Sequence, residues 1–205
     1  VLNEVEQDAS FYRECGGGIT LSGGECTLQP EFSAALLAEA HHRGINTAIE
    51  TAGNVPWQSF RRVVEHADTV LHDHKLSDPV RHKQWVGVDN VRIKANFQHA
   101  YETFPDKTFI ARTPVIPGFN DESEDIRRIL AHIQNMPNTC FEALDYHRMG
   151  KPKYEYLGLE FPMGDQKLDE EKIQRIHQMI RSEFPHLRSP GTAENGNLPN
   201  AASQR

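Results

Sequence analysis

The chain has 205 residues, of which 22 are Lys or Arg and 29 are Asp or Glu, so its formal net charge is -7. The length fits one domain with a sizeable core, and the acidic balance disfavours a nucleic-acid partner. No apolar run approaches the roughly 20 residues of a membrane-spanning helix, and no signal-peptide pattern stands out, so we expect a cytoplasmic protein with no membrane partner.

Segments of strand and helix character alternate along the chain. Hydrophobic periodicity and the positions of Pro and Gly predict these elements in chain order. The first half has a strand at 19–22, a helix that begins at Pro30 and is closed by Gly44, a strand at 46–50, a helix opened by Pro56 and a strand at 69–74. The second half has helices at 79–85 and 91–104, a strand at 108–116, a helix at 121–135, a strand at 139–146 and a helix at 169–184. This alternation predicts an α/β fold, with a mostly parallel sheet and helices packed outside it.

Five strands are fewer than the eight of a complete barrel, so the pattern fits either a TIM-like barrel or a partial TIM-like barrel. The stretch 151–167 is rich in Gly, Pro and aromatic residues and is predicted to be a long loop that closes over one end. From 189 to 205 the composition shifts to Pro, Gly, Asn, Ala and Ser without apolar periodicity. We therefore assign residues 1–188 to one barrel domain and predict a disordered tail at 189–205.

The stretch 16–25 reads Gly-Gly-Gly-Ile-Thr-Leu-Ser-Gly-Gly-Glu. It predicts a short buried strand that delivers Gly23, Gly24 and Glu25 at its carboxyl end. Glycines there let a small ligand approach the bare backbone, and the glutamate offers a fixed negative charge to a cation such as an amino group. The alternative is a glycine-rich turn that carries an exposed glutamate.

Charged residues of both signs follow the other predicted strands. The set at the carboxyl ends of the strands comprises Gly23, Gly24, Glu25, Glu50, Thr51, Asp73, Lys75, Arg112 and His147. The two cations could hold a carboxylate and the acidic groups an ammonium or a bound cation, so an amino-acid-like zwitterion would satisfy both halves. The alternative is that these charges pair with one another.

Several blocks of the chain resemble the glycyl radical enzyme activating enzymes, which are radical S-adenosylmethionine (SAM) proteins related to the pyruvate formate-lyase activating enzyme. The resemblance covers residues 1–184 in order. It is carried by the 16–25 stretch, by Leu-Gln-Pro-Glu-Phe at 28–32, Ile-Glu-Thr-Ala-Gly at 49–53, Asp-His-Lys at 73–75, Arg-Thr-Pro-Val-Ile-Pro-Gly at 112–118 and Tyr-His-Arg-Met-Gly-Lys-Pro-Lys-Tyr at 146–154.

The resemblance implies roles for these positions. The Gly23-Gly24-Glu25 motif would bind the amino group of SAM, and Glu50, Thr51 and Asp73 would lie beside its methionyl end. Lys75 and Arg112 would neutralise its carboxylate, and His147 would lie near the nucleoside. The complete protein would cleave SAM reductively to a 5'-deoxyadenosyl radical, which would abstract hydrogen from a glycine of a partner enzyme. A glycyl radical enzyme is therefore the expected partner, and a flavodoxin or a ferredoxin-type protein the expected electron donor.

The three cysteines depart from the family pattern. Relatives carry Cys-x3-Cys-x2-Cys, whose thiolates hold a [4Fe-4S] cluster, whereas Cys15, Cys26 and Cys140 are widely spaced and none forms a Cys-x2-Cys pair. We read them as ordinary small or buried residues. The expectation is a six-stranded radical SAM barrel that lacks its first strand and cluster loop, with the cluster ligands in a missing N-terminal segment and this chain alone inactive.

Two alternatives remain open at this stage. A metal-dependent barrel hydrolase could use His72 and His74, which strand alternation puts on one face, with Asp73 and His147 as further ligands. A non-catalytic, partner-binding fragment would explain the missing cysteine triplet, although the intact set of charged residues argues against it.

Overall fold

The structure, a computed structural model, describes residues 1–137 and 139–187. Its centre is a parallel sheet in which strands follow one another in chain order, β1-β2-β3-β4-β5. The strands are β1 (Gly18–Leu21), β2 (Asn46–Thr51), β3 (Thr69–Asp73), β4 (Thr108–Val115) and β5 (Thr139–Asp145). All five predicted strands are therefore confirmed, each within one residue at either end, and so is the partial barrel-like α/β architecture.

Helices connect successive strands. The 3-10 helix η2 (Cys26–Leu28) and α3 (Pro30–His42) follow β1, and α4 (Trp57–Val64) follows β2. The helices α5 (Pro79–Val86) and α6 (Val91–Thr103) follow β3, and α7 (Ser123–Ile133) follows β4. After the last strand, β5, the chain forms α8 (Lys151–Tyr156) and α9 (Glu170–Glu183). Proline at the first turn starts α3 and α5, as expected for a residue that lacks an N–H. The predicted helices are confirmed, with ends that differ by no more than two residues.

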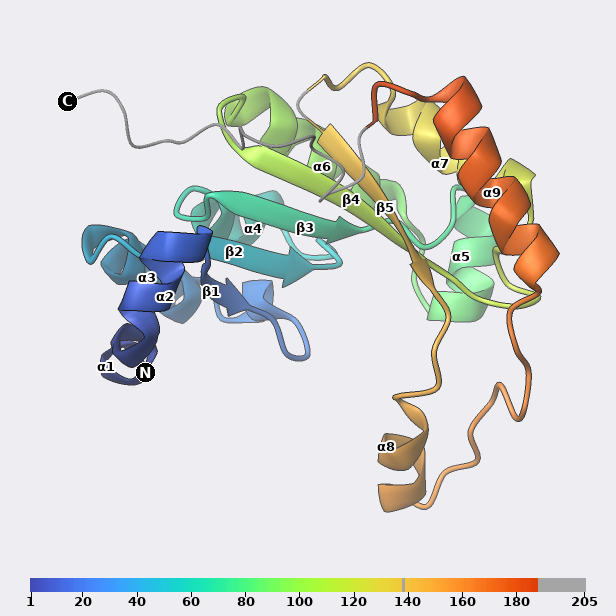
Figure 1. The fold of residues 1–205 in the computed structure, drawn as a ribbon, viewed down its shortest axis with the longest axis horizontal. Coiled ribbons are helices and arrows are strands. Elements are labelled where there is room, and N and C mark those ends of the chain that lie inside the picture. Colours follow the sequence, from blue (N-terminus) through green and yellow to red (C-terminus); the bar gives the residue numbers. More distant parts are fainter. Residues whose placement is uncertain (138, 188–205) are drawn as a thin grey trace.

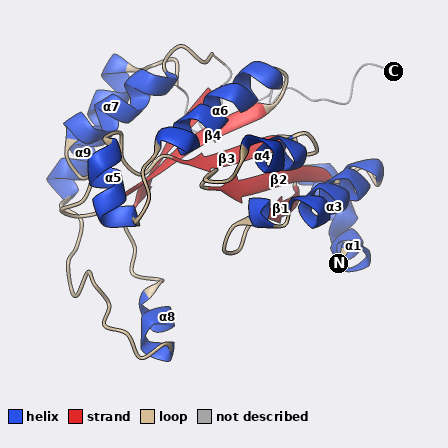
Figure 2. Cartoon of the chain, turned by 180° about the vertical axis from the view of Figure 1, so that it is seen from behind, coloured by secondary structure: helices blue, strands red, loops and turns tan. Residues whose placement is uncertain are grey.

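The helices α3, α4 and α6 lie on one side of the sheet (Figures 1 and 2). Seen from behind, α3, α4 and α6 lie in front of the strands, whereas the opposite view shows β2 to β5 with their other face toward the viewer (Figures 1 and 2). Burial alternates along β2, β3 and β4, so that every second side chain is buried against the helices. The remaining side chains are partly exposed and form what we call the inner face of the sheet.

The main core lies between the sheet and its helices. Strand side chains in it include Ile49, Val70, Phe109, Ala111 and Phe141, and helical partners include Leu37, Phe60, Phe97, Ile129 and Ile176, all at most 2% exposed. Burial of these apolar groups, worth about 1.5–3 kcal/mol for a large side chain, fixes the strand register. The register in turn decides which polar side chains share the inner face.

Two regions differ from the sequence-based expectation. The first 15 residues, for which no element was predicted, form α1 (Leu2–Val5), the 3-10 helix η1 (Glu6–Asp8) and α2 (Ala9–Cys15). The stretch 151–167 does not close over the sheet as a loop. It begins with α8 and extends away from the body of the molecule (Figures 1 and 2).

The domain boundary at 188 and the disordered tail predicted for 189–205 lie outside the described residues. None of the helices in the described part of the chain is long and apolar enough to cross a membrane.

Candidate functional site

Parallel strands bring their carboxyl ends to the same edge of the sheet, and the candidate site lies there. The strand register sets Asp73 opposite Arg112, and Arg112 opposite Glu142 on the next strand. Glu50 lies one strand away from β3, paired with Leu71. Since these positions alternate with the buried ones, they lie on the inner face, where they are accessible to a ligand.

A chain of hydrogen bonds and ion pairs crosses this edge. The Ser22 hydroxyl donates to Glu50 Oε2 at 2.6 Å, and Arg112 donates to Glu50 Oε1 at 2.7 Å and to Asp73 Oδ1 at 3.2 Å. Lys75 Nζ lies 3.8 Å from Asp73 Oδ2. We call these five residues the rim network. It joins strands β1 to β4, which places four of the residues predicted for the site in one connected group.

Electrostatics keep the central groups of the rim network charged. The Ser22 hydroxyl, followed by the Arg112 guanidinium, lowers the pKa of Glu50 below its usual range. Burial alone would lower the pKa of Arg112, but its bond to Glu50 and the charge of Asp73 outweigh burial and raise it. The Arg112 side chain is only 13% exposed, so water screens these interactions weakly.

Glu25 is held by the protein itself. Its Oε1 accepts hydrogen bonds from the Thr27 amide at 3.0 Å, the Thr27 hydroxyl at 2.6 Å and the Thr51 hydroxyl at 2.7 Å, and its Oε2 accepts one from the Ala52 amide at 2.9 Å. The carboxylate therefore also caps η2 and ties the end of β1 to the end of β2. Thr51 is buried and supports Glu25, rather than facing open space.

Two glycines leave the backbone bare between Ser22 and Glu25. Gly23 has φ +103°, a conformation that favours glycine, and no described atom lies within 4 Å of where a Cβ would stand on Gly23 or Gly24. The peptide groups here are open to a ligand. After β2, Gly53 (φ +67°) lies so close to the His72 ring that a Cβ there would collide with Nε2.

The charges at this edge are unequal. Glu25, Glu50, Asp73 and Glu142 contribute four negative charges against two positive ones from Lys75 and Arg112, so the set carries two net negative charges. SAM, with an ammonium, a sulfonium and a carboxylate, carries a net charge of the opposite sign. Arg112 Nε is buried and finds no partner among the described residues. The chemistry of this edge therefore fits a cationic amino acid.

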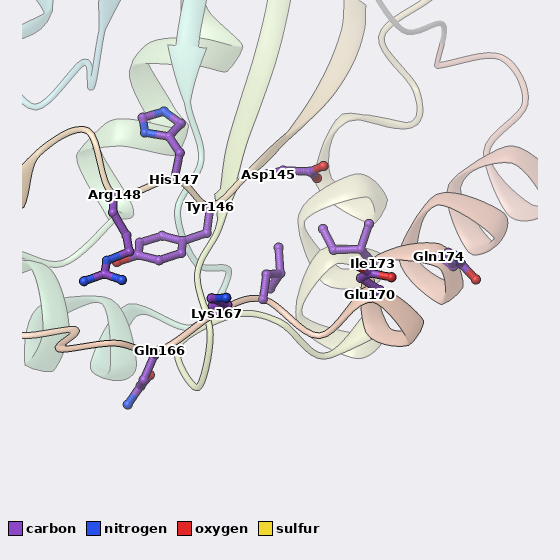
Figure 3. Close-up of a pocket in the computed structure, with 10 residues that line it drawn as sticks. Asp145, Tyr146, His147, Arg148, Gln166, Lys167, Glu170, Ile173 and Gln174 are labelled. Carbon is purple, nitrogen blue, oxygen red and sulfur yellow. The ribbon is translucent and has the colours of Figure 1, made fainter.

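His147 is not part of the rim network. It lies beyond β5, is exposed, and forms no hydrogen bond or ion pair with a described residue. It lines an open pocket of about 500 Å³ whose other walls come from the segment after β5 and from the stretch 166–174 that leads into α9 (Figure 3). Its predicted place near a nucleoside remains a prediction.

The histidine pair considered for a metal site faces the wrong way. His72 and His74 do share a face, as expected, but it is the helix-packed face, opposite to Asp73, and they are 0% and 4% exposed. Their rings stand 4.8 Å apart and contact Phe97. In the ranges 1–137 and 139–187 no group of three or more His, Cys, Asp or Glu side chains could hold a metal ion. The structure therefore does not bring together the residues proposed for a hydrolytic metal centre, among those it describes.

The described residues also form no group that could hold an iron–sulfur cluster, because the three cysteines do not converge on one site. Cys15 is exposed on α2, Cys26 is buried beside Glu25, and Cys140 lies on β5. Burial, and then the charge of Glu25, raise the pKa of Cys26 to about 12. A thiol held protonated in this way is a poor cluster ligand.

A testable prediction follows for thiol reactivity. Because only the thiolate reacts, iodoacetamide at about pH 8 should alkylate the exposed Cys15 and leave Cys26 unmodified in the folded protein. Peptide mass spectrometry after brief labelling measures both sites, and labelling in urea supplies the fully reactive control. Equal labelling of the two cysteines in the folded protein would contradict the burial described here.

Sequence reasoning missed two residues at this edge. Ser22 was considered only as the end of a strand, yet it bonds Glu50. Glu142 lies on the inner face beside Arg112, partly exposed, and forms no hydrogen bond or ion pair with a described residue. A charged residue directly after Phe141 in a predicted strand could have indicated that Glu142 faces away from the core.

The fold, together with an edge lined by glycines and charged side chains, indicates the superfamily to which the chain belongs. The sequence model described as Radical SAM superfamily matches residues 1–130, and the chain belongs to this superfamily. SAM and a [4Fe-4S] cluster are the cofactors of the superfamily. In fold, the chain is similar to a domain of a pyruvate-formate lyase-activating enzyme from Bacteroides vulgatus, with a TM-score of 0.66 and 24% identity over 84% of this chain and 97% of that one.

Curated relatives are activating enzymes. The (2S)-3-sulfopropanediol sulfolyase activating enzyme of Bilophila wadsworthia is 46% identical over 89% of this chain and 60% of that protein. The isethionate sulfite-lyase activating enzyme of Oleidesulfovibrio alaskensis is 44% identical over 89% and 59%, and its choline trimethylamine-lyase activating enzyme 36% identical over 90% and 61%. The chain thus spans about 60% of the length of these relatives.

Proposed function

We propose that this chain is the SAM-binding part of an activating enzyme for a glycyl radical enzyme. The rim network carries the proposal: opposite charges at one edge of a parallel sheet, beside two bare glycines, match the two ends of the methionyl group. The relatives at 32–47% identity, all named as activating enzymes, support it. The metal-dependent hydrolase has no support from them.

The residues take distinct roles in this proposal. The backbone at Gly23 and Gly24, and the carboxylates of Glu50 and Asp73, receive the ammonium group. Lys75 and Arg112 attract the carboxylate with their positive charges, while Glu25 and Thr51 hold the β1 and β2 ends in place. His147 lies on the nucleoside side. None of these groups transfers a proton; they bind and orient SAM and exclude water from its sulfonium.

The reductive part of the activity lies outside the residues described here. In the superfamily the electron that cleaves SAM comes from a [4Fe-4S] cluster, and we propose that its cysteine ligands belong to a segment beyond this chain. The cleavage yields methionine and a 5'-deoxyadenosyl radical, which takes one hydrogen atom from a backbone glycine of the partner and becomes 5'-deoxyadenosine. A flavodoxin or a ferredoxin-type protein is the proposed donor, and the cytoplasm the proposed location.

The partner is a glycyl radical enzyme, and we propose that it cleaves a carbon–sulfur bond. Relatives named for a sulfolyase or a sulfite-lyase are 43–47% identical to the chain. Relatives named for choline, indoleacetate and 4-hydroxyphenylacetate enzymes are 32–36% identical. The relative named for a (2S)-3-sulfopropanediol dehydratase is 33% identical, so the identities favour a sulfolyase or sulfite-lyase partner over a dehydratase or a decarboxylase.

The first test is the gene. An in-frame Cys-x3-Cys-x2-Cys upstream of the Val1 codon is expected, and its absence would contradict the proposed activity.

The second test uses the full-length protein, purified anaerobically with its cluster restored. With dithionite and SAM it should release methionine and 5'-deoxyadenosine in equal amounts, and with its partner it should give the doublet signal of a glycyl radical in electron paramagnetic resonance. Failure to form 5'-deoxyadenosine would refute the proposal.

A further inference from the structure

The chain segment that carries Lys75 leaves the sheet after Asp73, the last residue of β3, and has no regular secondary structure. A free loop would let the Lys75 ammonium move, because a lysine side chain already has four rotatable bonds. The backbone here is not free, however. Four successive carbonyl groups, from His74 to Ser77, each accept a hydrogen bond from a side chain.

The donors come from neighbouring elements. The Thr113 hydroxyl donates to His74 O at 2.7 Å, Asn120 Nδ2 to Lys75 O at 2.7 Å, and Asn90 Nδ2 to Leu76 O at 2.6 Å. Asn90 and Lys94 also bond Ser77 O. The segment is therefore held in one conformation from two sides, with β4 and the turn after it on one side and α6 with its preceding residue on the other.

Asn120 differs from the other donors because it also bonds the backbone at the end of β4. It is 0% exposed, and its amide is fully committed: Nδ2 also donates to Pro114 O at 2.9 Å, and Oδ1 accepts from the Ile116 amide at 2.7 Å. One side chain thus locks Lys75, two residues past the end of β3, to the end of β4. Since Arg112 lies on β4, the lock sets the spacing of the two cations.

We propose that Asn120 is a positioning residue for SAM, acting through Lys75. Buried behind the backbone, Asn120 cannot touch a ligand on the inner face, whereas the Lys75 side chain reaches that face and is 32% exposed. Fixing the carbonyl of Lys75 removes freedom that binding would otherwise have to remove, so the ammonium stands ready for the ligand carboxylate. The inference rests on the proposed function, since it needs Lys75 to bind SAM.

A double-mutant cycle separates positioning from mere structural support. SAM affinity is measured by calorimetric titration of the full-length protein with its cluster, for the wild type, Asn120→Ser, Lys75→Ala and the double variant. Asn120→Ser should weaken binding about fivefold to tenfold in the wild-type background and less than about twofold in the Lys75→Ala background. Such coupling is what action through Lys75 requires.

Thr47→Ala is the matched control. The Thr47 hydroxyl is buried and bonds Asp68 and His66 O near the amino end of the sheet, far from the rim network. This variant should lower the melting temperature and leave SAM affinity unchanged. If Asn120→Ser does not fold, Asn120→Asp, which keeps the shape and the acceptor for Ile116, takes its place in the cycle.

The outcomes are distinguishable. Equal weakening by the Asn120 variant in both backgrounds, or no weakening in either, overturns the inference while leaving the proposed function intact. A wild-type protein that does not bind SAM, or a Lys75→Ala variant that binds it as tightly as the wild type, overturns the assignment of Lys75 and the inference with it.

Discussion

Replacing Arg112 by alanine is expected to damage both stability and SAM binding. The guanidinium bridges Glu50 and Asp73 at 2.7 and 3.2 Å, so its removal leaves Glu50 without a cation and Asp73 with only the Lys75 ammonium at 3.8 Å. Loss of one partner of a fully buried pair costs about 3–5 kcal/mol, and partial exposure of these carboxylates reduces the loss to about 2 kcal/mol. Losing a charge-assisted bond to the ligand should also weaken SAM binding about tenfold to a hundredfold.

Two further variants make this prediction specific. Arg112→Lys keeps the charge but cannot bridge two carboxylates with a planar fork, so intermediate losses are expected. Lys75→Ala removes only a partly exposed pair at 3.8 Å, so it should weaken binding while changing the unfolding free energy by no more than about 1 kcal/mol. Thermal unfolding and SAM titration of the three variants supply the comparison. An Arg112→Ala protein as stable as the wild type would show that the rim network contributes nothing to the fold.

The order of strands and helices could be predicted from the sequence because apolar side chains recur with the period of each element. Ile126, Ile129, Leu130 and Ile133 mark one face of α7, and all four are buried. The same reasoning failed at the N-terminus, where α2 contains no buried residue and so gives no amphipathic signal. It also failed for α8, which contains no buried residue and extends from the body as a short helix.

The members of the site were predictable, but their connections were not. Strand ends in an alternating β/α pattern share one edge of the sheet. This pattern therefore predicted that Glu50, Asp73, Lys75 and Arg112 lie close together. Which group pairs with which depends on register and rotamer, and these are set by packing far from the site. The sequence therefore predicted a carboxylate at Glu25 open to a ligand, whereas the protein itself supplies donors to both of its oxygens.

The sequence did not indicate that the polar residues behind the edge are buried. Asn120 follows a Pro-Gly turn and reads as an ordinary loop residue, and His72 and His74 read as metal ligands. Their roles emerge only from what surrounds them, since an amide or an imidazole is compatible with either a loop or a core. The core histidines nevertheless have a consequence that can be measured.

The stability of the protein should fall steeply in acid because of His72. Burial lowers the pKa of this imidazole to about 3, and the ring is 0% exposed with both nitrogens unpaired among the described residues. The imidazole binds a proton with its ordinary pKa of 6.5 in the unfolded chain, whereas in the folded protein it stays neutral down to about pH 3. Unfolding therefore takes up a proton between these two values, and stability present above the unfolded pKa is lost at about 1.4 kcal/mol per pH unit as the pH falls.

His72→Leu tests this directly, because leucine has a similar volume and no charge to gain. At about pH 8 the variant should be at least as stable as the wild type, since it removes two unpaired buried polar atoms. At about pH 4.5 it should be more stable by about 3 kcal/mol. Urea unfolding across this range provides the measurement, with the exposed His42→Leu on α3 as the control that should leave the pH dependence unchanged. Parallel pH profiles for His72→Leu and the wild type would mean that the histidine is protonated, and so hydrated, in the folded protein.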